Sequence, residues 1–303
     1  MSLLLLAASC FGVVLLLPER AYAWGPAMHL QLGVEILKNA FLLEKGLRAL
    51  LLQFPYSYLY GCIAADIIFA KGLAKLHEHS HCWRVGLDIL HGASTACQQA
   101  FAYGYLSHLA ADIVAHNYFV PERIIEAYPA RTLRHLYWEV RFDTCIRKEF
   151  WSLAVEVASS SQHEHDELLE KMVRRTLFSF KTDKKIFNGL LVLNRAAQWQ
   201  KMLVSLSEKS VWHLSTGQVE RYRILSFEAS LDFLTRRGGG WSFRQDPTGR
   251  AALSTAKKAR KLLRNLSKQG KLTPGVYART LKAPFESRPF ERFSFSCPPA
   301  MCS

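Results

Sequence analysis

Apolar residues recur at helical spacing through most of this chain, whereas the period-two alternation of half-buried strands is scarce. The helical pattern covers residues 30–53, 98–118, 131–158, 166–180, 184–212 and 218–236. Prolines at 55, 121 and 129 and a run of glycines at 238–240 punctuate it. With 303 residues, the chain can bury a sizeable core. The sequence therefore predicts an all-α fold.

The first 23 residues have the pattern of a secretory signal peptide. The apolar run from Leu3 to Leu17 has 15 residues, fewer than the roughly 20 that a membrane-spanning helix needs, which argues against a membrane anchor. The small-residue pattern Ala21-Tyr22-Ala23 then precedes Trp24. We expect cleavage before Trp24 and export of the mature chain, secreted or periplasmic. The new α-amino group, with a pKa of about 8, can itself bind a metal.

The remaining sequence divides at the glycine run. We expect a helical domain over residues 24–240 and a basic C-terminal extension over 241–303. Of the formal net charge of +14, the stretch 255–292 contributes 11 Lys or Arg against two Glu. Residues 257–268 form a helix candidate with leucines on one side. Three interpretations stay open for this surface: a solvated face, a patch for anionic lipid, or a nucleic-acid contact.

Metal-ligand residue types lie on one predicted helix of the first half. His108, Asp112 and His116 are spaced at i, i+4 and i+8, so we expect them to project from one stripe of the helix. A His-Asp pair at this spacing is often a surface ion pair, but the segment around it is too apolar for a solvated face. Polar groups buried together need a shared partner, which a metal ion supplies.

Three further places carry candidate ligands. His135 and Glu139 repeat the i, i+4 spacing on the next helix. Asp66 is a lone carboxylate in an apolar run, where it either caps a helix or is paired. In the sequence HEHSHCW we favour His81 as the ligand, with His79 as the alternative.

Two other patterns carry less weight as metal sites. The histidines at 163 and 165 with Asp166 could compete for a metal, but acids at this point suit the first turn of a helix. The cysteines after residue 24 are scattered without C-x-x-C spacing, which argues against a thiolate zinc finger. Their disulfide pairing cannot be read from the sequence.

Together these residues resemble the zinc-dependent phospholipase C family, which is all-helical and holds three zinc ions. The resemblance covers roughly residues 24–145 and implies Zn²⁺ as cofactor. It implies that the amine and carbonyl of the amino-terminal Trp bind zinc and that Asp112 bridges two ions. The implied ligands are Trp24, His29, Asp66, His81, His108, Asp112, His116, His135 and Glu139.

The resemblance implies an exported zinc-dependent phosphodiester hydrolase acting on phospholipid headgroups at a membrane surface. Asp66 would ligate zinc or take the proton of the attacking water. Fungal and plant three-zinc nucleases share the fold and also begin at a Trp, so nucleic acid is an alternative substrate. A noncatalytic helical protein that binds anionic envelopes is a third interpretation. The sequence predicts no protein partner.

Overall fold

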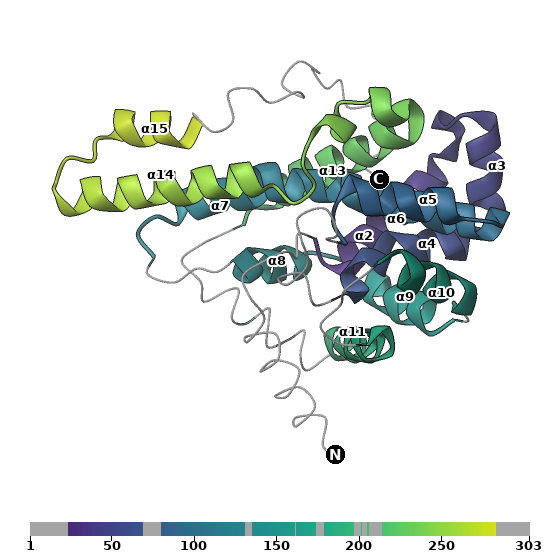
Figure 1. The fold of residues 1–303 in the computed structure, drawn as a ribbon. Helices are drawn as coiled ribbons and strands as arrows, with labels where there is room; N and C mark the ends of the chain where they lie inside the picture. Colours follow the sequence, from purple (N-terminus) through teal and green to yellow (C-terminus); the bar gives the residue numbers. More distant parts are fainter. Residues whose placement is uncertain are drawn as a thin grey trace.

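One long helix, α6 (Ala96–Val114), runs through the centre of the molecule, and most other helices of the first half pack on it (Figure 1). The computed structural model describes residues 24–68, 80–130, 135–160, 162–173, 179–196, 201, 205 and 214–282. Every regular element within these ranges is helical, so the all-α prediction is confirmed. No helix among them is both long enough and apolar enough to cross a bilayer.

Five helices surround or adjoin α6. These are α2 (Pro26–Lys38), α3 (Lys45–Gln53), α4 (Pro55–Ala64), α5 (Trp83–Gly92) and α13 (Thr216–Arg236). The 3-10 turn η2 (Ala65–Ile67) follows α4 directly. The side chain of Thr95 caps α6 by accepting a hydrogen bond from the backbone N–H of Gln98 at 3.1 Å. Because α6 is buried around nearly its whole circumference, polar groups on it are shielded from water.

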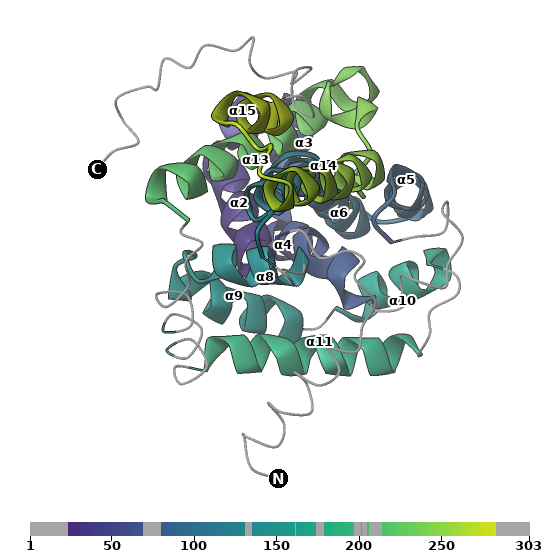
Figure 2. The ribbon, with the colours of Figure 1, turned by 90° about the vertical axis from the view of Figure 1, so that its left-hand side faces the viewer.

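Figure 2 shows most of the remaining helices together on one side of this core. The remaining helices include α7 (Val120–Glu126), α8 (His135–Asp143), α9 (Lys148–Ser159), α10 (His163–Met172) and α11 (Phe180–Arg195). Helix α10 begins at His163 with acids in its first turn, as the sequence predicts. After the 3-10 turns η5 (Arg237–Gly239) and η6 (Ser242–Arg244) come α14 (Arg250–Lys268) and α15 (Pro274–Lys282).

Several predicted helices are shorter than expected. The segment 30–53 is broken after Asn39, whose backbone and side-chain N–H groups both donate to the carbonyl of Glu35. A short 3-10 turn, η1 (Ala40–Leu42), then leads into α3. The segment 98–118 changes into a π-helical turn, η4 (Ala115–Phe119). Helix α4 was not predicted, because burial on all sides leaves it without amphipathic periodicity.

The crossing of α4 and α6 has no room for side chains at two glycines. A Cβ atom at Gly61 would overlap the carbonyl oxygen of Phe101, and one at Gly104 would overlap the carbonyl oxygen of Tyr58. The two backbones therefore touch, which places the carbonyl of Cys62 against the ring of His108. This crossing is the contact that aligns α6 with the end of α4.

The segment after the glycine run packs on the body before it projects. The indole N–H of Trp83 donates to the carbonyl of Gln245 at 2.9 Å, and the side-chain amide of Asn117 donates to that of Asp246 at 2.8 Å. Helix α14 then runs along α7 and extends beyond the body together with α15 (Figure 1). The loop at 245–249 therefore packs against the helical domain that precedes the glycine run.

The α4–α6 crossing predicts a contrast between two glycine substitutions. Gly61→Ala forces the helices apart and should lower the free energy of unfolding by about 1–3 kcal/mol or more. Gly189→Ala, in α11 with no atom within 4 Å of the added Cβ, should be neutral or raise it by about 0.5–1 kcal/mol. Urea denaturation of both variants measures this. Equal stability of Gly61→Ala and the unmodified protein would contradict the close crossing.

Candidate metal centre

Two candidate ligands come from neighbouring turns of α6. The Nε2 atom of His108 lies 3.3 Å from Oδ2 of Asp112, as the i, i+4 spacing predicts. Both side chains are buried, with exposed fractions of 1% and 0%. The pair is therefore shielded from water, and a surface ion pair is excluded.

Two more candidates reach this pair from outside α6. Asp66 lies in η2, and His81 lies just before α5. The Nε2 atom of His81 is 3.3 Å from Oδ1 of Asp66, 3.3 Å from Oδ2 of Asp112 and 3.0 Å from Nε2 of His108. Ligands of a tetrahedral zinc ion lie about 3.3 Å apart, given metal–ligand distances of about 2.0–2.1 Å. These separations are those of ligands around one zinc ion.

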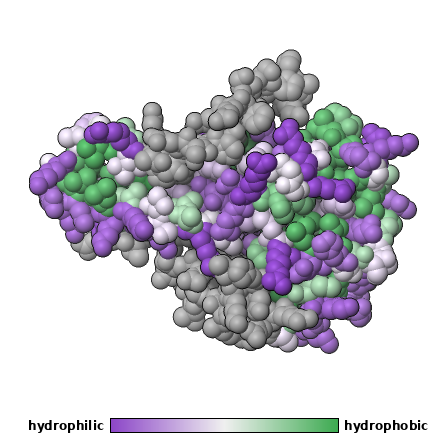
Figure 3. All heavy atoms as spheres, turned by 45° about the horizontal axis from the view of Figure 1, so that its top comes forward, coloured by the Kyte–Doolittle hydropathy of each residue, from purple (hydrophilic) through white to green (hydrophobic). Residues whose placement is uncertain are grey.

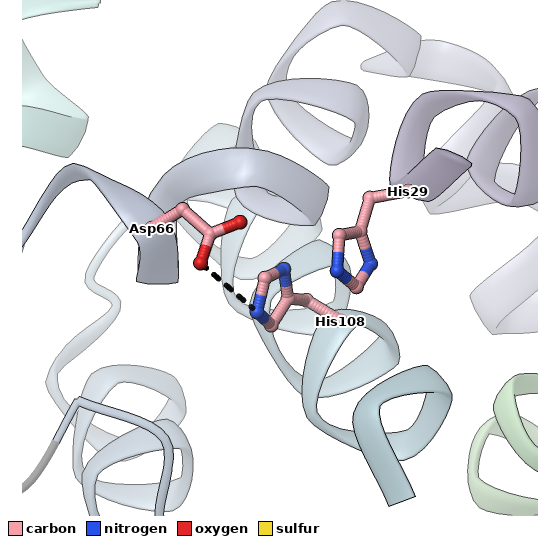
Figure 4. Close-up of side chains that lie close together, drawn as sticks. All are labelled: His29, Asp66 and His108. Atoms are coloured by element: carbon pink, nitrogen blue, oxygen red, sulfur yellow. Dashed lines mark ion pairs between the residues drawn. The ribbon is translucent and has the colours of Figure 1, made fainter. Parts of the chain in front are cut away.

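His29 of α2 approaches the other oxygen of Asp112. Its Nε2 atom lies 3.2 Å from Oδ1 of Asp112, and its ring stacks on that of His108 with centroids 3.8 Å apart. Figure 4 shows His29 and Asp66 on opposite sides of the His108 ring. The two oxygens of Asp112 therefore face different histidines, an arrangement suited to a carboxylate that bridges two ions.

The protein orients these rings through their second nitrogen. Nδ1 of His108 donates to the carbonyl of Cys62 at 2.9 Å, which directs Nε2 toward the carboxylates. Nδ1 of His81 lies 3.0 Å from the hydroxyl of Ser80, whose carbonyl accepts a hydrogen bond from Tyr105 at 2.5 Å. Both rings are held by the supporting contacts that metal-binding histidines require.

The polar atoms of the site fit a cation. Both oxygens of Asp112 and Nε2 of His29 are buried. Within the described residues, none of these three atoms forms a well-aligned hydrogen bond. Burial alone would raise the pKa of Asp112, but His108 and His29 hold it well below its usual range. Burial opposes charge on His108, yet Asp112 and Asp66 raise its pKa above the usual value. An ionised carboxylate among converging nitrogens is a donor set for zinc.

Trp24 is anchored beside the same helix. Its side chain is fully buried, and the indole N–H lies 3.1 Å from the carbonyl of Ala111 and 3.0 Å from the hydroxyl of Ser226. Its ring packs on Phe142 with centroids 4.2 Å apart. Because Ala111 precedes Asp112, the backbone of Trp24 is fixed close to this turn of α6. The signal peptide at 1–23 lies outside the described residues, so its cleavage stays a prediction.

His116 lies in the π turn η4 and faces the loop after the glycine run. Its Nδ1 donates to the carbonyl of Pro247 at 2.6 Å, and the backbone of Gly249 lies against it. Within the described residues, His116 is not among the ligand atoms that converge at Asp112. The sequence predicts His116 on the same helix stripe as His108 and Asp112, but the ligand atom of His116 does not reach their cluster. The support from Pro247 could not be foreseen, because nothing in its sequence marks it as a partner of His116.

The last two predicted ligands belong to α8. His135 is its first residue and Glu139 lies one turn later, so the pair keeps the predicted helical spacing. Their side chains lie outside the described residues, and so does the alternative ligand His79. Asp66 follows α4 rather than beginning a helix, which removes the helix-capping interpretation.

The helices and the buried histidine–carboxylate cluster define an all-helical metal-binding protein. The sequence model of the zinc dependent phospholipase C family matches residues 28–196, more than half of the chain. The chain therefore belongs to the zinc-dependent phospholipase C family, and the matched range contains every candidate ligand except Trp24. Neither the curated proteins nor the solved structures gave a match to the chain.

The position of Asp112 predicts a specific effect of removing its charge. In Asp112→Asn, the buried cluster loses the carboxylate that faces both His29 and His81, so zinc binding should weaken strongly. In the unmodified protein, zinc at about 100 times its Kd adds about 2.7 kcal/mol of stability. We expect the rise in Tm on adding zinc to disappear in the variant.

Asp232→Asn is the matched control, because Asp232 is also buried but accepts hydrogen bonds from the backbone and hydroxyl of Ser242. It should keep the zinc-dependent rise in Tm even if its own stability falls. An undiminished response in Asp112→Asn would contradict the assignment of Asp112 as a ligand.

Proposed function

We propose that this protein is an exported zinc-dependent phospholipase C that hydrolyses the phosphodiester between diacylglycerol and a phospholipid headgroup. The single observation that carries the proposal is the buried carboxylate of Asp112, with His29 at one oxygen and His81 and His108 at the other. The family membership supports the same chemistry. A purely structural polar cluster would instead consist of well-aligned hydrogen bonds.

The residues fall into two groups around Asp112. Oδ2 of Asp112 with His81, His108 and Asp66 would hold one zinc ion, and Oδ1 with His29 would contribute to a second. The amine and carbonyl of Trp24 would complete the second group after cleavage. The family resemblance also implies His116, His135 and Glu139 as zinc ligands, and His116 lies apart from the two groups around Asp112. Bound zinc supplies positive charge for the phosphodiester and lowers the pKa of a water molecule.

Asp66 is the residue to which we assign proton transfer. Its carboxylate is 1% exposed and its Oδ1 lies 3.3 Å from His81 and 4.0 Å from His108. A carboxylate in this position can accept the proton of the attacking water at one oxygen while the other contacts of the site fix its orientation. In His81 and His108, by contrast, Nδ1 contacts Ser80 or Cys62 and Nε2 faces the carboxylates.

Export is part of the proposal because it generates the amino terminus. The indole of Trp24 is anchored by Ala111 and Ser226 independently of any metal. Cleavage before Trp24 would therefore release an amine that is already positioned beside α6, without further folding. We therefore propose that the metal site is completed after export, when cleavage releases the amine of Trp24.

The proposed reaction predicts the behaviour of Asp66→Asn. Loss of a positioned proton acceptor lowers kcat by about 100- to 10,000-fold, while folding is preserved by the similar size of Asn. Release of phosphocholine from phosphatidylcholine vesicles in the presence of zinc measures this. Asp88→Asn, at an exposed carboxylate of α5, is the control and should retain full activity.

Two outcomes would overturn the proposal. Hydrolysis of single-stranded nucleic acid without release of phosphocholine would make the protein a nuclease of this fold. Absence of both activities in the zinc-loaded, processed chain would leave a noncatalytic binding protein.

The projecting helix α14 supports docking to anionic lipid. Residues 250–282 contain ten Lys or Arg and no acidic residue. Figure 3 shows hydrophilic side chains over most of this arm, with hydrophobic ones among them near its end. On α14, Leu262 is 51% exposed, whereas Leu263 is buried. Cations around an exposed apolar residue match an anionic membrane surface better than a solvated face.

Charge removal on α14 tests this docking role. The triple substitution Lys257→Gln, Lys261→Gln and Lys268→Gln should weaken binding to phosphatidylserine vesicles about 100-fold, at about 1 kcal/mol per cation. The same change at Lys148, Lys181 and Lys185, on α9 and α11, is the control and should have little effect. Vesicle co-sedimentation at two salt concentrations measures both. Equal losses in the two variants, or loss of nucleic-acid binding alone, would refute lipid docking by α14.

A further inference from the structure

A second group of metal-ligand side chains lies where three helices begin. Ser57 is in the first turn of α4, Cys97 in the first turn of α6, and Glu164 and His165 in the first turn of α10. Ligand atoms of Cys97, Glu164 and His165 all lie within 4.8 Å of one another. None of these residues belongs to the cluster at Asp112 or to the ligands that the family resemblance implies.

The distances within this group suit a metal ion. Sγ of Cys97 lies 3.6 Å from Nε2 of His165. Sulfur and nitrogen ligands of tetrahedral zinc lie about 3.5 Å apart, given Zn–S of about 2.3 Å and Zn–N of about 2.0–2.1 Å. The hydroxyl of Ser57 lies 3.0 Å from this sulfur and 3.1 Å from this nitrogen, so it can donate to a metal-bound thiolate.

The surroundings hold the histidine rigidly and leave one side open. His165 is 2% exposed, and its ring stacks on Phe101 with centroids 4.9 Å apart and planes 1° apart. The side-chain amide of Gln98 donates to the carbonyl of Glu164 at 3.2 Å, which fixes the start of α10 against α6. The carboxylate of Glu164 is at the exposed rim. An ion can therefore enter from solvent at Glu164 and reach the buried imidazole.

Protonation of the ligands agrees with metal binding. Burial lowers the pKa of His165, so its ring is neutral at neutral pH and can offer a lone pair. The thiol of Cys97 loses its proton when it binds a metal ion. The exposed Glu164 contributes a carboxylate beside the sulfur and nitrogen donors. A set of S, N and O donors favours Zn²⁺ over the hard cations Ca²⁺ and Mg²⁺.

We propose that Cys97, Glu164 and His165 form a separate binding site for a single Zn²⁺ ion that joins α10 to α6. On binding, the sulfur–metal bond forms and the thiol proton of Cys97 passes to solvent. The hydroxyl of Ser57 donates to the thiolate and includes α4 in the same junction. The three protein ligands come from the first turns of α6 and α10, and water would complete the coordination of the ion.

Cobalt substitution separates this site from the cluster at Asp112. Co²⁺ bound to a thiolate absorbs in the near ultraviolet by charge transfer from sulfur, whereas Co²⁺ bound only by nitrogen and oxygen does not. The ligands assigned to the catalytic zinc ions offer only nitrogen and oxygen. Titration of the reduced, metal-depleted full chain with Co²⁺ should produce the thiolate absorption, with an amplitude at saturation that corresponds to one thiolate-bound Co²⁺ per chain.

Cys97→Ser should abolish this absorption and leave phosphocholine release intact. Cys145→Ser is the matched control, because Cys145 is an exposed free cysteine outside the group. Glu164→Gln should keep the absorption but raise the Kd for Co²⁺ at least about tenfold. Asp112→Asn should keep it unchanged, so a failure of the proposed phospholipase function would not affect this readout.

The proposal is overturned if millimolar Co²⁺ gives no thiolate absorption, or if Cys97→Ser retains the full signal. Circular dichroism of Cys97→Ser checks that the variant folds. If it does not fold, Glu164→Gln still decides, because Glu164 is exposed and its substitution removes no buried contact. An unchanged Kd for Co²⁺ in Glu164→Gln would then exclude Glu164 and with it the three-ligand site.

Discussion

The structure depends on one buried charge, the ionised carboxylate of Asp112 in the last turn of α6. A carboxylate with no exposed surface is tolerated only if positive charge or hydrogen bonds compensate it. Here the compensating nitrogens come from elements far apart in the sequence: His29 on α2, His81 before α5 and His108 on α6. The carbonyl of Cys62 on α4 holds the ring of His108. The glycine crossing of α4 and α6 is what lets these elements approach closely enough. The packing of α2, α4 and α5 on α6 therefore brings together the side chains of this cluster.

Trp24 and the loop before α14 both contact the chain near Asp112. Trp24 donates to Ala111, just before Asp112, and His116 donates to Pro247, in the loop that leads to α14. Trp24 and the loop that precedes the basic helix α14 therefore contact the same stretch of chain, residues 111–116. In the proposed function, this arrangement would connect metal binding with docking to an anionic membrane.

Much of the site follows from the sequence because its ligands obey local rules. His108 and Asp112 share a helix face at i, i+4 spacing, and Asp66 stands out as a charge in an apolar run. The scarcity of period-two alternation likewise predicts the all-α fold class. In each case, the signal comes from residues close together in the chain, where the helix period determines which side chains are neighbours.

What the sequence could not give depends on tertiary contacts. The assignment of each Asp112 oxygen to a different histidine is set by how α2 and the segment before α5 pack on α6. Helix α4 has no polar face to reveal it, and the π turn after Val114 has no local marker. The group of Cys97, Glu164 and His165 shows the same limit, since the sequence read at 163–166 indicates only a helix start. Its cysteine lies 67 positions away from Glu164 in the chain and becomes a neighbour only when α10 packs on α6.

The most direct test of the account is a crystal structure of the processed protein with diffraction data collected on both sides of the zinc absorption edge. The account predicts anomalous peaks on both sides of the Asp112 carboxylate, each about 2 Å from one oxygen, with His81 and His108 at one peak and His29 at the other. Absence of a peak at Asp112 would contradict it, above all if His29 and His81 formed aligned hydrogen bonds to the carboxylate instead.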